Sequence, residues 1–363
     1  MQILLTEKDK LFKTKTNIFL SGHLKENNPI NLKHLWQSLY KDSLISLNNT
    51  FTENILLTIE ICRINPGIGL FLLTQVTCLE IINKFADKLL KEKYSDKLLS
   101  GENIACFSLT EPQAGSDVIN METTAKKETN KWILNGHKIW ASNGSISDAI
   151  ITFAQTKKHR DKLGITCYLI PSKEIEILKD TPKLGVKITP SNELFIKNLS
   201  IPESNIIGNI GDGIKIALSA ITLGRLYCAA QAIGLLEGIL AESIKHSTKR
   251  NQFGKSISEN QAIKWYIADM TKDLEAGRLL LLKACSVKEN NSSELNKYSS
   301  MAKYFCTSIA QKHSVTAVQI QGGKGLTDSS YASMAYRDSK VLEIYEGTNE
   351  IQKLILAKEL NLN

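Results

Sequence analysis

A carboxylate near the C-terminus is the residue of this chain best placed for proton transfer. Glu346 precedes a glycine that frees the backbone, and Thr348, a helix-capping residue type, follows two positions later. The apolar run at 351–356 then predicts an amphipathic helix. A carboxylate on such a loop, set against an apolar wall, loses solvation, and its pKa rises toward that of a usable base. Taken alone, the segment fits a solvated glutamate at a helix N-terminus at least as well.

Two upstream loops could bind a polar or flat ligand. Residues 110–117, rich in hydroxyls and turn formers, follow an apolar run, and their glycine permits close backbone approach. A plain connecting loop explains the same composition. Trp140 and Ser142 place an indole beside a hydroxyl and could flank a flat ring, although a half-exposed core tryptophan fits equally well.

Two further segments could bind phosphate groups. Arg250, with Gln252 and Phe253, ends a predicted helix, where arginine either satisfies the helix C-terminus or binds a phosphate. The glycine cluster at 319–325 could admit a pyrophosphate or an adenine to the backbone. It is not a dinucleotide fingerprint, because it follows a helix and lacks the GxGxxG spacing.

Composition excludes several classes of protein. The 363 residues are 42% apolar and 23% charged, which is typical of a soluble globular chain, and no apolar run reaches transmembrane length. The net charge of +8 comes from dispersed lysines without a basic run, so a small anionic ligand fits at least as well as nucleic acid, and a basic solvated surface fits better than either. Seven scattered cysteines without a CxxC pair and six dispersed histidines predict no metal site. Residues 1–8 lack the layout of a signal peptide, which predicts a cytoplasmic protein without a membrane partner.

The pattern of apolar residues divides the chain into three regions. Residues 1–102 repeat at helical spacing, and 103–212 alternate short apolar runs with turn residues. Within the middle region, Asn135-Gly136 predicts a β-hairpin turn. Residues 213–363 carry long apolar stripes that predict helices of roughly 20 to 25 residues packed as a bundle. The fold class is therefore α+β, in the order helical, β, helical.

Five blocks in this order resemble the acyl-CoA dehydrogenase family of flavoproteins. They extend over about 101–360, roughly seven tenths of the chain, and any one of them alone is weak. The blocks are Thr110-Glu111-Pro112-x-Ala114-Gly115-Ser116-Asp117, Asn135-Gly136-x-Lys138-x-Trp140-x-Ser142-Asn143-Gly144, Arg250-x-Gln252-Phe253-Gly254 with Gln261, Gln319-x-x-Gly322-Gly323-x-Gly325, and Arg337-Asp338 followed by Ile344-Tyr345-Glu346-Gly347-Thr348.

The resemblance implies a shortened N-terminal helical domain, a barrel-like antiparallel middle domain, a C-terminal four-helix bundle, and FAD held between subunits of a homotetramer or homodimer. Thr110 and Ser142 would bond the flavin ring, and Trp140 would lie against it. Part of the FAD site would come from a neighbouring subunit. The residues at matching cofactor positions are Phe107, Thr110, Ser116, Trp140, Ser142, Arg250, Gln252, Phe253, Asn260, Gln261, Gln319, Gly323, Thr348 and Glu350.

The resemblance also implies α,β-dehydrogenation of an acyl thioester. Glu346 would remove the α-proton while hydride passes from the β-carbon to flavin N5, with an electron-transfer flavoprotein as acceptor. Gly224 occupies the position where some relatives carry the base, which favours Glu346. The matching substrate positions are Ser116, Thr222, Arg225 and Gly347, and Arg225 matches an arginine that braces the loop of the base.

Departures from the family leave the thioester carrier open. A Pro-Glu-x-x-Gly-Gly segment is missing from the N-terminal region, and Thr222 stands where many relatives carry an aspartate on the CoA side. Both CoA and an acyl carrier protein are therefore expected carriers. A flavin oxidase or monooxygenase on the same scaffold is one alternative, although the intact Tyr345-Glu346-Gly347-Thr348 argues against it. A non-catalytic paralogue is another, but its DNA-associated examples carry an extra basic C-terminal domain, whereas this chain ends soon after its last motif.

Overall fold

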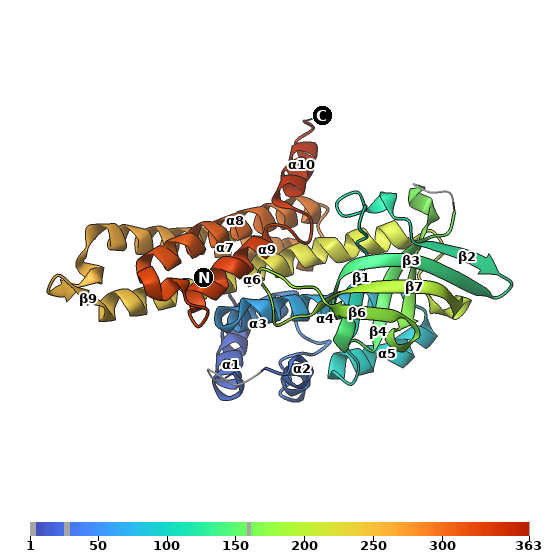
Figure 1. Cartoon of the computed structure of the whole chain (residues 1–363), viewed down its shortest axis with the longest axis horizontal. Helices are drawn as coiled ribbons and strands as arrows, with labels where there is room; N and C mark the ends of the chain where they lie inside the picture. Colours follow the sequence, from blue (N-terminus) through green and yellow to red (C-terminus); the bar gives the residue numbers. More distant parts are fainter. Residues whose placement is uncertain (1–4, 25–29, 158–160, 363) are drawn as a thin grey trace.

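The computed structural model describes residues 5–24, 30–157 and 161–362, and within them helices precede and follow a single large sheet (Figure 1). The first four residues of the segment without signal-peptide layout lie outside the described part. Thr6 and Thr50 begin two of the first helices through reciprocal capping boxes with Asp9 and Glu53. The N-terminal helices are α1 (Glu7–His23), α2 (Leu32–Lys41), α3 (Phe51–Ile64), α4 (Pro66–Phe85) and α5 (Lys88–Ser100).

The middle region is a sheet in the order β6-β7-β3-β1-β4-β5-β8, with β2 paired to β3 and β4. Its strands are β1 (Ala105–Ser108), β2 (Thr124–Glu128), β3 (Lys131–Ser142), β4 (Ala149–Gln155), β5 (Ile165–Pro171), β6 (Glu176–Asp180), β7 (Ser191–Pro202) and β8 (Ile206–Ile207). Most neighbours are antiparallel as expected, but β4 runs parallel to β1 and β2. The predicted β domain is confirmed, and the parallel pairs make its sheet mixed.

The hairpin predicted at Asn135-Gly136 is wrong. Both residues lie inside β3, where the pairing with β7 shifts register between Leu134 and Gly136. Gly136 is required there because a Cβ would lie 2.1 Å from the Thr123 hydroxyl oxygen. The turn falls six residues earlier, at 129–130, since Glu128 of β2 pairs directly with Lys131 of β3. A glycine that serves a bulge and close packing therefore imitates a turn signal.

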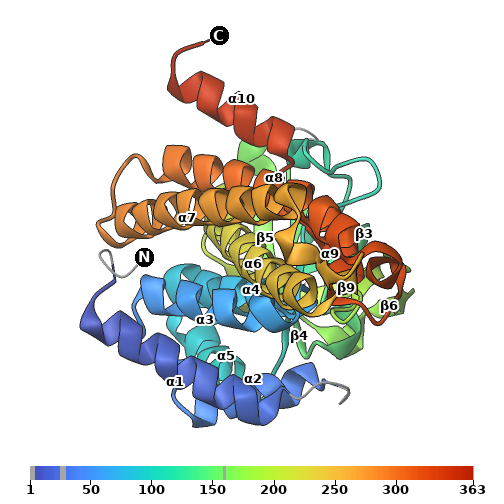
Figure 2. The same cartoon turned by 90° about the vertical axis from the view of Figure 1, so that its left-hand side faces the viewer.

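Three of the C-terminal helices, α6, α7 and α8, are longer than the roughly 20 to 25 residues predicted, and the last helix leaves the bundle. They are α6 (Gly213–Lys249), α7 (Gln261–Glu289), α8 (Leu295–Gln321), α9 (Tyr331–Leu342) and α10 (Asn349–Glu359), with the hairpin strands β9 (Asn251–Gln252) and β10 (Lys255–Ser256) between α6 and α7. Helices α6 to α9 form the bundle, and α6 has 37 residues because it also packs on α3, α4 and β5. Figure 2 shows α1 and α2 on one side of the molecule and α10 projecting from the other.

The long apolar helices belong to the core of the fold. By length and composition alone, α4 and α6 could cross a membrane, but 72% and 78% of their most apolar windows are buried inside the protein. One hydrophobic cluster joins the N-terminal helices to the sheet, and a second fills the C-terminal bundle. All seven cysteines are free and buried. The domain boundaries at 102 and 212 stay a prediction.

Candidate active site

The loop between α9 and α10, residues 343–349, holds Glu346 in a left-handed backbone conformation. Its φ is +57° and that of Gly347 is +83°. A glutamate rarely adopts this conformation, and it persists only where neighbouring groups fix it. The buried Gln352 of α10 provides such a fixation, since its Nε2 donates to the carbonyl oxygens of Glu346 at 3.3 Å and Gly347 at 2.8 Å.

The Glu346 carboxylate lies directly over Gly224 of α6. A Cβ added to Gly224 would lie 2.2 Å from Oε2 of Glu346, so only glycine leaves the carboxylate its place. Burial raises the pKa of Glu346 to about 7, and the nearby cations of Arg225 and Lys303 partly oppose the shift. A half-buried carboxylate with a pKa near neutrality has the properties of a general base. The desolvation predicted from the sequence of this loop is thus present.

Arg225 is buried beneath the site but does not hydrogen-bond the 343–349 loop. Its Nη1 donates to Asn296 Oδ1 at 2.8 Å and to Ser300 Oγ at 3.3 Å, both on α8, while its buried Nε has no partner. The charge of Arg225 lowers the pKa of Glu346, and the predicted bracing of the loop by Arg225 stays a prediction. Thr222, one turn earlier on α6, donates its hydroxyl to the carbonyl of Leu218 at 2.8 Å. Its substrate role stays a prediction.

Four predicted cofactor residues come together where β1 and β3 end. Phe107 lies opposite Ser142 in the sheet, and the carbonyl of Thr110 accepts a hydrogen bond from the Ile139 N–H at 2.9 Å. Trp140, with φ of +56°, keeps 52% of its surface exposed. An exposed indole beside two hydroxyls fits a flat polar ring such as a flavin. Ser116 lies exposed on the loop that follows β1.

A buried ion pair fixes that loop. Lys138 Nζ lies 2.7 Å from Glu111 Oε1, and both side chains are almost completely buried. Glu111 also accepts hydrogen bonds from the backbone N–H groups of Glu122 at 2.6 Å and Thr123 at 3.1 Å. Burial alone would raise the pKa of Glu111, but the Lys138 ammonium and these hydrogen bonds hold it below its ordinary value. The segment after β1 is therefore rigid at its base.

Seven further predicted cofactor residues lie away from Glu346. Most of them border the β9–β10 hairpin, at the opposite end of the molecule from the large sheet (Figure 1). Phe253 at the hairpin tip has φ of +53°, and its side chain is fully exposed (101%). The charges of Arg250 and Lys324 both act on His246, which places the glycine cluster beside the end of α6. This distal group consists of Arg250, Gln252, Phe253, Asn260, Gln261, Gln319 and Gly323.

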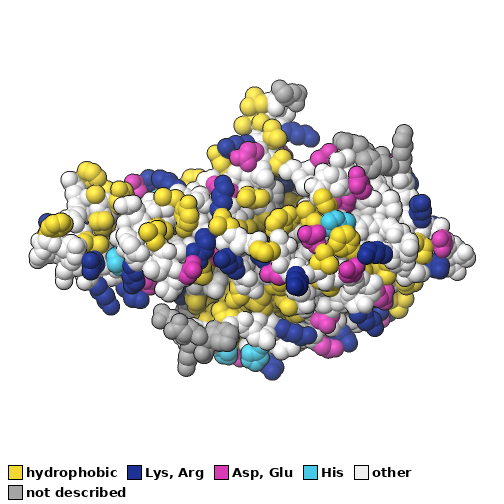
Figure 3. Space-filling model, in the orientation of Figure 1, with side chains coloured by type: hydrophobic (Ala, Val, Ile, Leu, Met, Phe, Trp, Pro, Cys, Tyr) yellow, Lys and Arg dark blue, Asp and Glu magenta, His cyan; other side chains and the backbone are white. Residues whose placement is uncertain are grey.

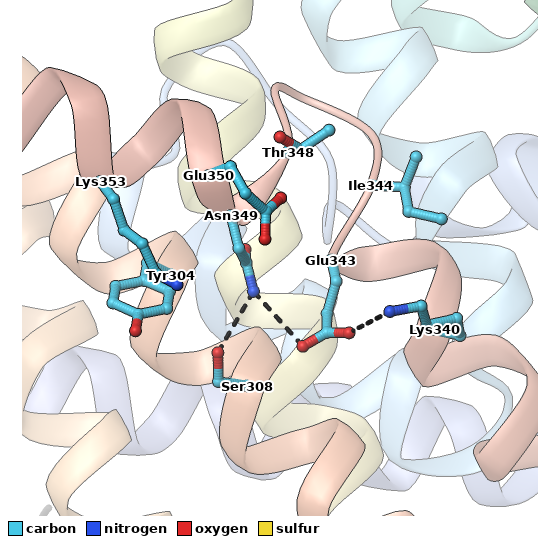
Figure 4. Close-up of a pocket in the computed structure, with 9 residues that line it drawn as sticks. All are labelled: Tyr304, Ser308, Lys340, Glu343, Ile344, Thr348, Asn349, Glu350 and Lys353. Carbon is cyan, nitrogen blue, oxygen red and sulfur yellow. Dashed lines mark hydrogen bonds and ion pairs between the residues drawn. The ribbon is translucent and has the colours of Figure 1, made fainter.

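A polar cleft of about 190 Å³ opens beside the N-terminus of α10 (Figure 4). Thr348, which caps α10 by accepting the Ile351 N–H at 3.3 Å, and Glu350 both line it. Lys340 and Lys353 add positive charge to its walls. The cleft therefore places both predicted C-terminal cofactor residues at a site suited to a polar ligand. Among the residues described, no group of three or more His, Cys, Asp or Glu side chains is arranged to hold a metal ion.

No sequence motif indicated the residues that hold the 343–349 loop. Lys303, Asn349 and Gln352 are buried around it, yet none carries a family signature in the sequence. One signal was available for Lys303, because it shares the buried face of α8 with Ser299, Cys306 and Ala310. A lysine on an apolar helical face requires a buried partner.

The chain belongs to the acyl-CoA dehydrogenase family. Residues 106–199 match the middle domain of acyl-CoA dehydrogenase and residues 211–361 match its C-terminal domain. The acyl-CoA dehydrogenase of Bacillus subtilis is 38% identical over 304 residues, which are 83% of this chain and 80% of that protein. The predicted resemblance is confirmed.

Solved structures show the same fold along nearly the whole chain. The butyryl-CoA dehydrogenase of Megasphaera elsdenii is similar with a TM-score of 0.92 and 30% identity, over 98% of this chain and 99% of that one. The prolyl acyl carrier protein oxidase AnaB is similar with a TM-score of 0.93 and 26% identity, over 99% and 100% of the two chains. The helices α1–α5, which carried no family motif, therefore have counterparts in these relatives. The protein is an FAD-dependent oxidoreductase that acts on CH–CH groups.

Proposed function

We propose that this protein dehydrogenates an acyl thioester between its α- and β-carbons, with Glu346 as the general base. The observation that carries the proposal is the Glu346 carboxylate itself, half-buried over Gly224 on a fixed loop, with a pKa of about 7. Removal of a weakly acidic α-proton requires a desolvated base held in a defined geometry. When bound, FAD supplies the acceptor for the hydride that leaves the β-carbon.

Each residue around the carboxylate then has a defined task. Glu346 takes the α-proton on its carboxylate, and Gly224 leaves the space that this carboxylate occupies. Arg225 and Lys303 stabilise its charged form, which keeps a share of the base deprotonated at neutral pH. Thr110, Trp140 and Ser142 would bind the flavin ring on the side of the sheet, and Thr348 and Glu350 would contact the cofactor near α10.

We infer that the complete FAD site needs a second copy of this chain. The distal group lies at the end of the molecule away from Glu346, and Phe253 makes a fully exposed tip there. Figure 3 shows hydrophobic side chains on the surface of the bundle and along α10, where Leu354 and Leu360 are exposed. Exposed apolar surface of this kind is typical of a subunit interface. A homodimer or homotetramer would bring a partner's distal group to each flavin.

The carrier of the acyl group is proposed as either CoA or an acyl carrier protein. Support comes from both sides, because the similar structures include a butyryl-CoA dehydrogenase and an acyl carrier protein oxidase. An electron-transfer flavoprotein is the proposed acceptor, and the cytoplasm the proposed location.

Anaerobic titration of the purified yellow protein with acyl-CoAs and with acyl carrier proteins tests the proposal. One class of thioester should bleach the flavin, and the class that does so identifies the carrier. Because the base acts deprotonated, the rate of bleaching should rise with pH through about 7. Reoxidation of the bleached protein by air at the rate of turnover would instead favour an oxidase, and no bleaching by any thioester would refute the proposal.

A further inference from the structure

A fully buried lysine lies behind the 343–349 loop. Lys303 of α8 has no exposed surface. Its Nζ donates to the carbonyl oxygen of Glu343 at 3.0 Å and to Asn349 Oδ1 at 2.9 Å. These acceptors stand at the two ends of the loop, where the chain leaves α9 and where it enters α10. One ammonium group therefore joins both ends of the segment that carries Glu346.

Further hydrogen bonds hold the same two ends of the loop. The Asn349 N–H donates to the Glu343 carbonyl at 3.0 Å, and Thr307, one turn along α8 from Lys303, donates its hydroxyl to Asn349 Oδ1 at 3.0 Å. Asn349 Nδ2 in turn donates to Ser308 Oγ at 3.2 Å (Figure 4). Both ends of the loop are thereby fixed to α8, and the left-handed φ of Glu346 lies midway between the fixed points.

The ionisable groups that face Glu346 come from three directions. Arg225 and Cys228 lie on α6, Lys303 lies on α8, and Tyr345 precedes Glu346 in the loop. Burial raises the pKa of Cys228 to about 12 and that of Tyr345 well above its ordinary value, so both stay neutral. The two cations are therefore the groups that favour the charged form of Glu346.

Lys303 itself faces carboxylates. Burial lowers its pKa, while the charges of Glu346, Glu343 and Glu350 oppose that shift and favour the ammonium. Its hydrogen bonds and its electrostatic contacts thus converge on the same loop.

We propose that Lys303 is a positioning residue for the reaction, which fixes both ends of the 343–349 loop and supplies a buried positive charge behind the Glu346 carboxylate. The inference rests on the proposed function and adds a residue to it. Loss of Lys303 releases the Glu343 end of the loop from α8 and leaves Asn349 held by Thr307 and Ser308 alone, so the carboxylate moves from its place over Gly224. The same loss removes a charge that favours the deprotonated base.

The test is anaerobic flavin reduction by the thioester that bleaches the wild type, across a pH series spanning the pKa of Glu346. FAD content and the unfolding midpoint of each variant are measured first. Lys303→Met keeps the volume of the stem and removes the ammonium. Its reduction rate at neutral pH should fall about 100-fold, and the pH midpoint should move about one unit alkaline. Thr307→Val removes one donor without a change in charge, so the rate should fall by less and the midpoint should stay.

Lys297→Met is the matched control. Lys297 lies on the same helix but pairs with Glu294 at the surface, so its loss should leave rate and midpoint unchanged. A Lys303→Met protein that binds FAD and keeps the wild-type rate and midpoint overturns the proposal. Where that variant does not fold, Asn349→Asp tests the proposal. A negative charge beside Lys303 should move the pH midpoint of the reduction rate alkaline, and an unchanged midpoint overturns the proposal. A wild type that no thioester bleaches refutes the proposed function and the inference together.

Discussion

The 343–349 loop and the β9–β10 hairpin both contain residues of the predicted active site. The loop is fixed by contacts within the chain, whereas the tip of the hairpin is exposed. The loop is held from α8 by Lys303 and from α10 by Gln352. The hairpin ends in Phe253, whose side chain is fully exposed. A general base must be positioned by its own chain before substrate arrives. An exposed aromatic side chain at a hairpin tip is instead available for contact with another molecule. On the proposed shared site, the difference separates groups that are preorganised within one chain from groups that assembly with a second chain would complete.

Glu346→Gln should give the largest effect, because it removes the proton acceptor while it keeps the shape of the loop. The rate of flavin reduction by the thioester should fall by about 10³-fold or more, and the FAD content should stay that of the wild type. Stopped-flow absorbance of the flavin measures the rate. A variant that bleaches as fast as the wild type would show that another group is the base.

Lys138→Met extends the comparison to the loop after β1, which a buried ion pair of the same chain fixes. Glu111 would be left buried without its partner, so the free energy of unfolding should fall by about 3–5 kcal/mol. Since the pKa of Glu111 is lower in the folded state, the pair's contribution is fully present at neutral pH and is lost as the pH falls through that lowered pKa. Urea unfolding at neutral and acid pH measures both effects. Lys127→Met, whose pair with Glu203 is exposed, should cost under about 1 kcal/mol; equal losses would contradict the role of the buried pair.

Gly224→Ala should show how far the reaction depends on the position of the Glu346 carboxylate, because the variant displaces the carboxylate but keeps it. The new methyl group would overlap the Glu346 carboxylate, which must shift, so flavin reduction should slow by about 100-fold while the base remains present. Rapid-reaction kinetics at saturating thioester measure the change. Gly22→Ala is the control, because nothing lies within 4 Å of that position on α1. If both variants react like the wild type, the carboxylate does not need the place that the structure gives it.

Phe253→Ala should give the smallest effect, and it should change FAD binding and leave the stability of the chain almost unchanged. The exposed ring makes no contact within the chain, so the stability of the apoprotein should change by less than about 0.5 kcal/mol. FAD binding should weaken by about tenfold, because the ring would lie against the cofactor of a neighbouring subunit. Fluorescence titration of the apoprotein with FAD measures this. Unchanged FAD affinity would remove the hairpin from the cofactor site.

The sequence predicted the elements that depend on local periodicity, and it predicted the base through the five family blocks. Helical spacing predicted the helices of the N-terminal and C-terminal regions, and the short apolar runs predicted the strands between them. The glycine and threonine beside Glu346 fitted a solvated glutamate at least as well, and the resemblance to acyl-CoA dehydrogenases made Glu346 the predicted base. Its raised pKa agrees with the desolvation that this role requires.

What could not be predicted depends on contacts between distant segments. Lys303 resembles a surface lysine in the sequence, because nothing local shows that Glu343 and Asn349 will meet it. The length of α6 exceeded the prediction since one helix serves partners in all three regions. At Gly136, the close approach of Thr123 requires the glycine, and such packing cannot be distinguished from a turn by composition alone.

Because α6 is continuous, it sets the distance between the Glu346 site and the distal group of the same chain. From Arg225 to Arg250 the helix advances 25 residues, or about 38 Å at 1.5 Å per residue, farther than one dinucleotide reaches. On the proposed shared site, each chain's Arg250 thus serves its partner's flavin, while its Glu346 serves its own. Two chains, one defective at Arg250 and the other at Glu346, would then complement each other when mixed, since one site of the pair would recover both functional residues.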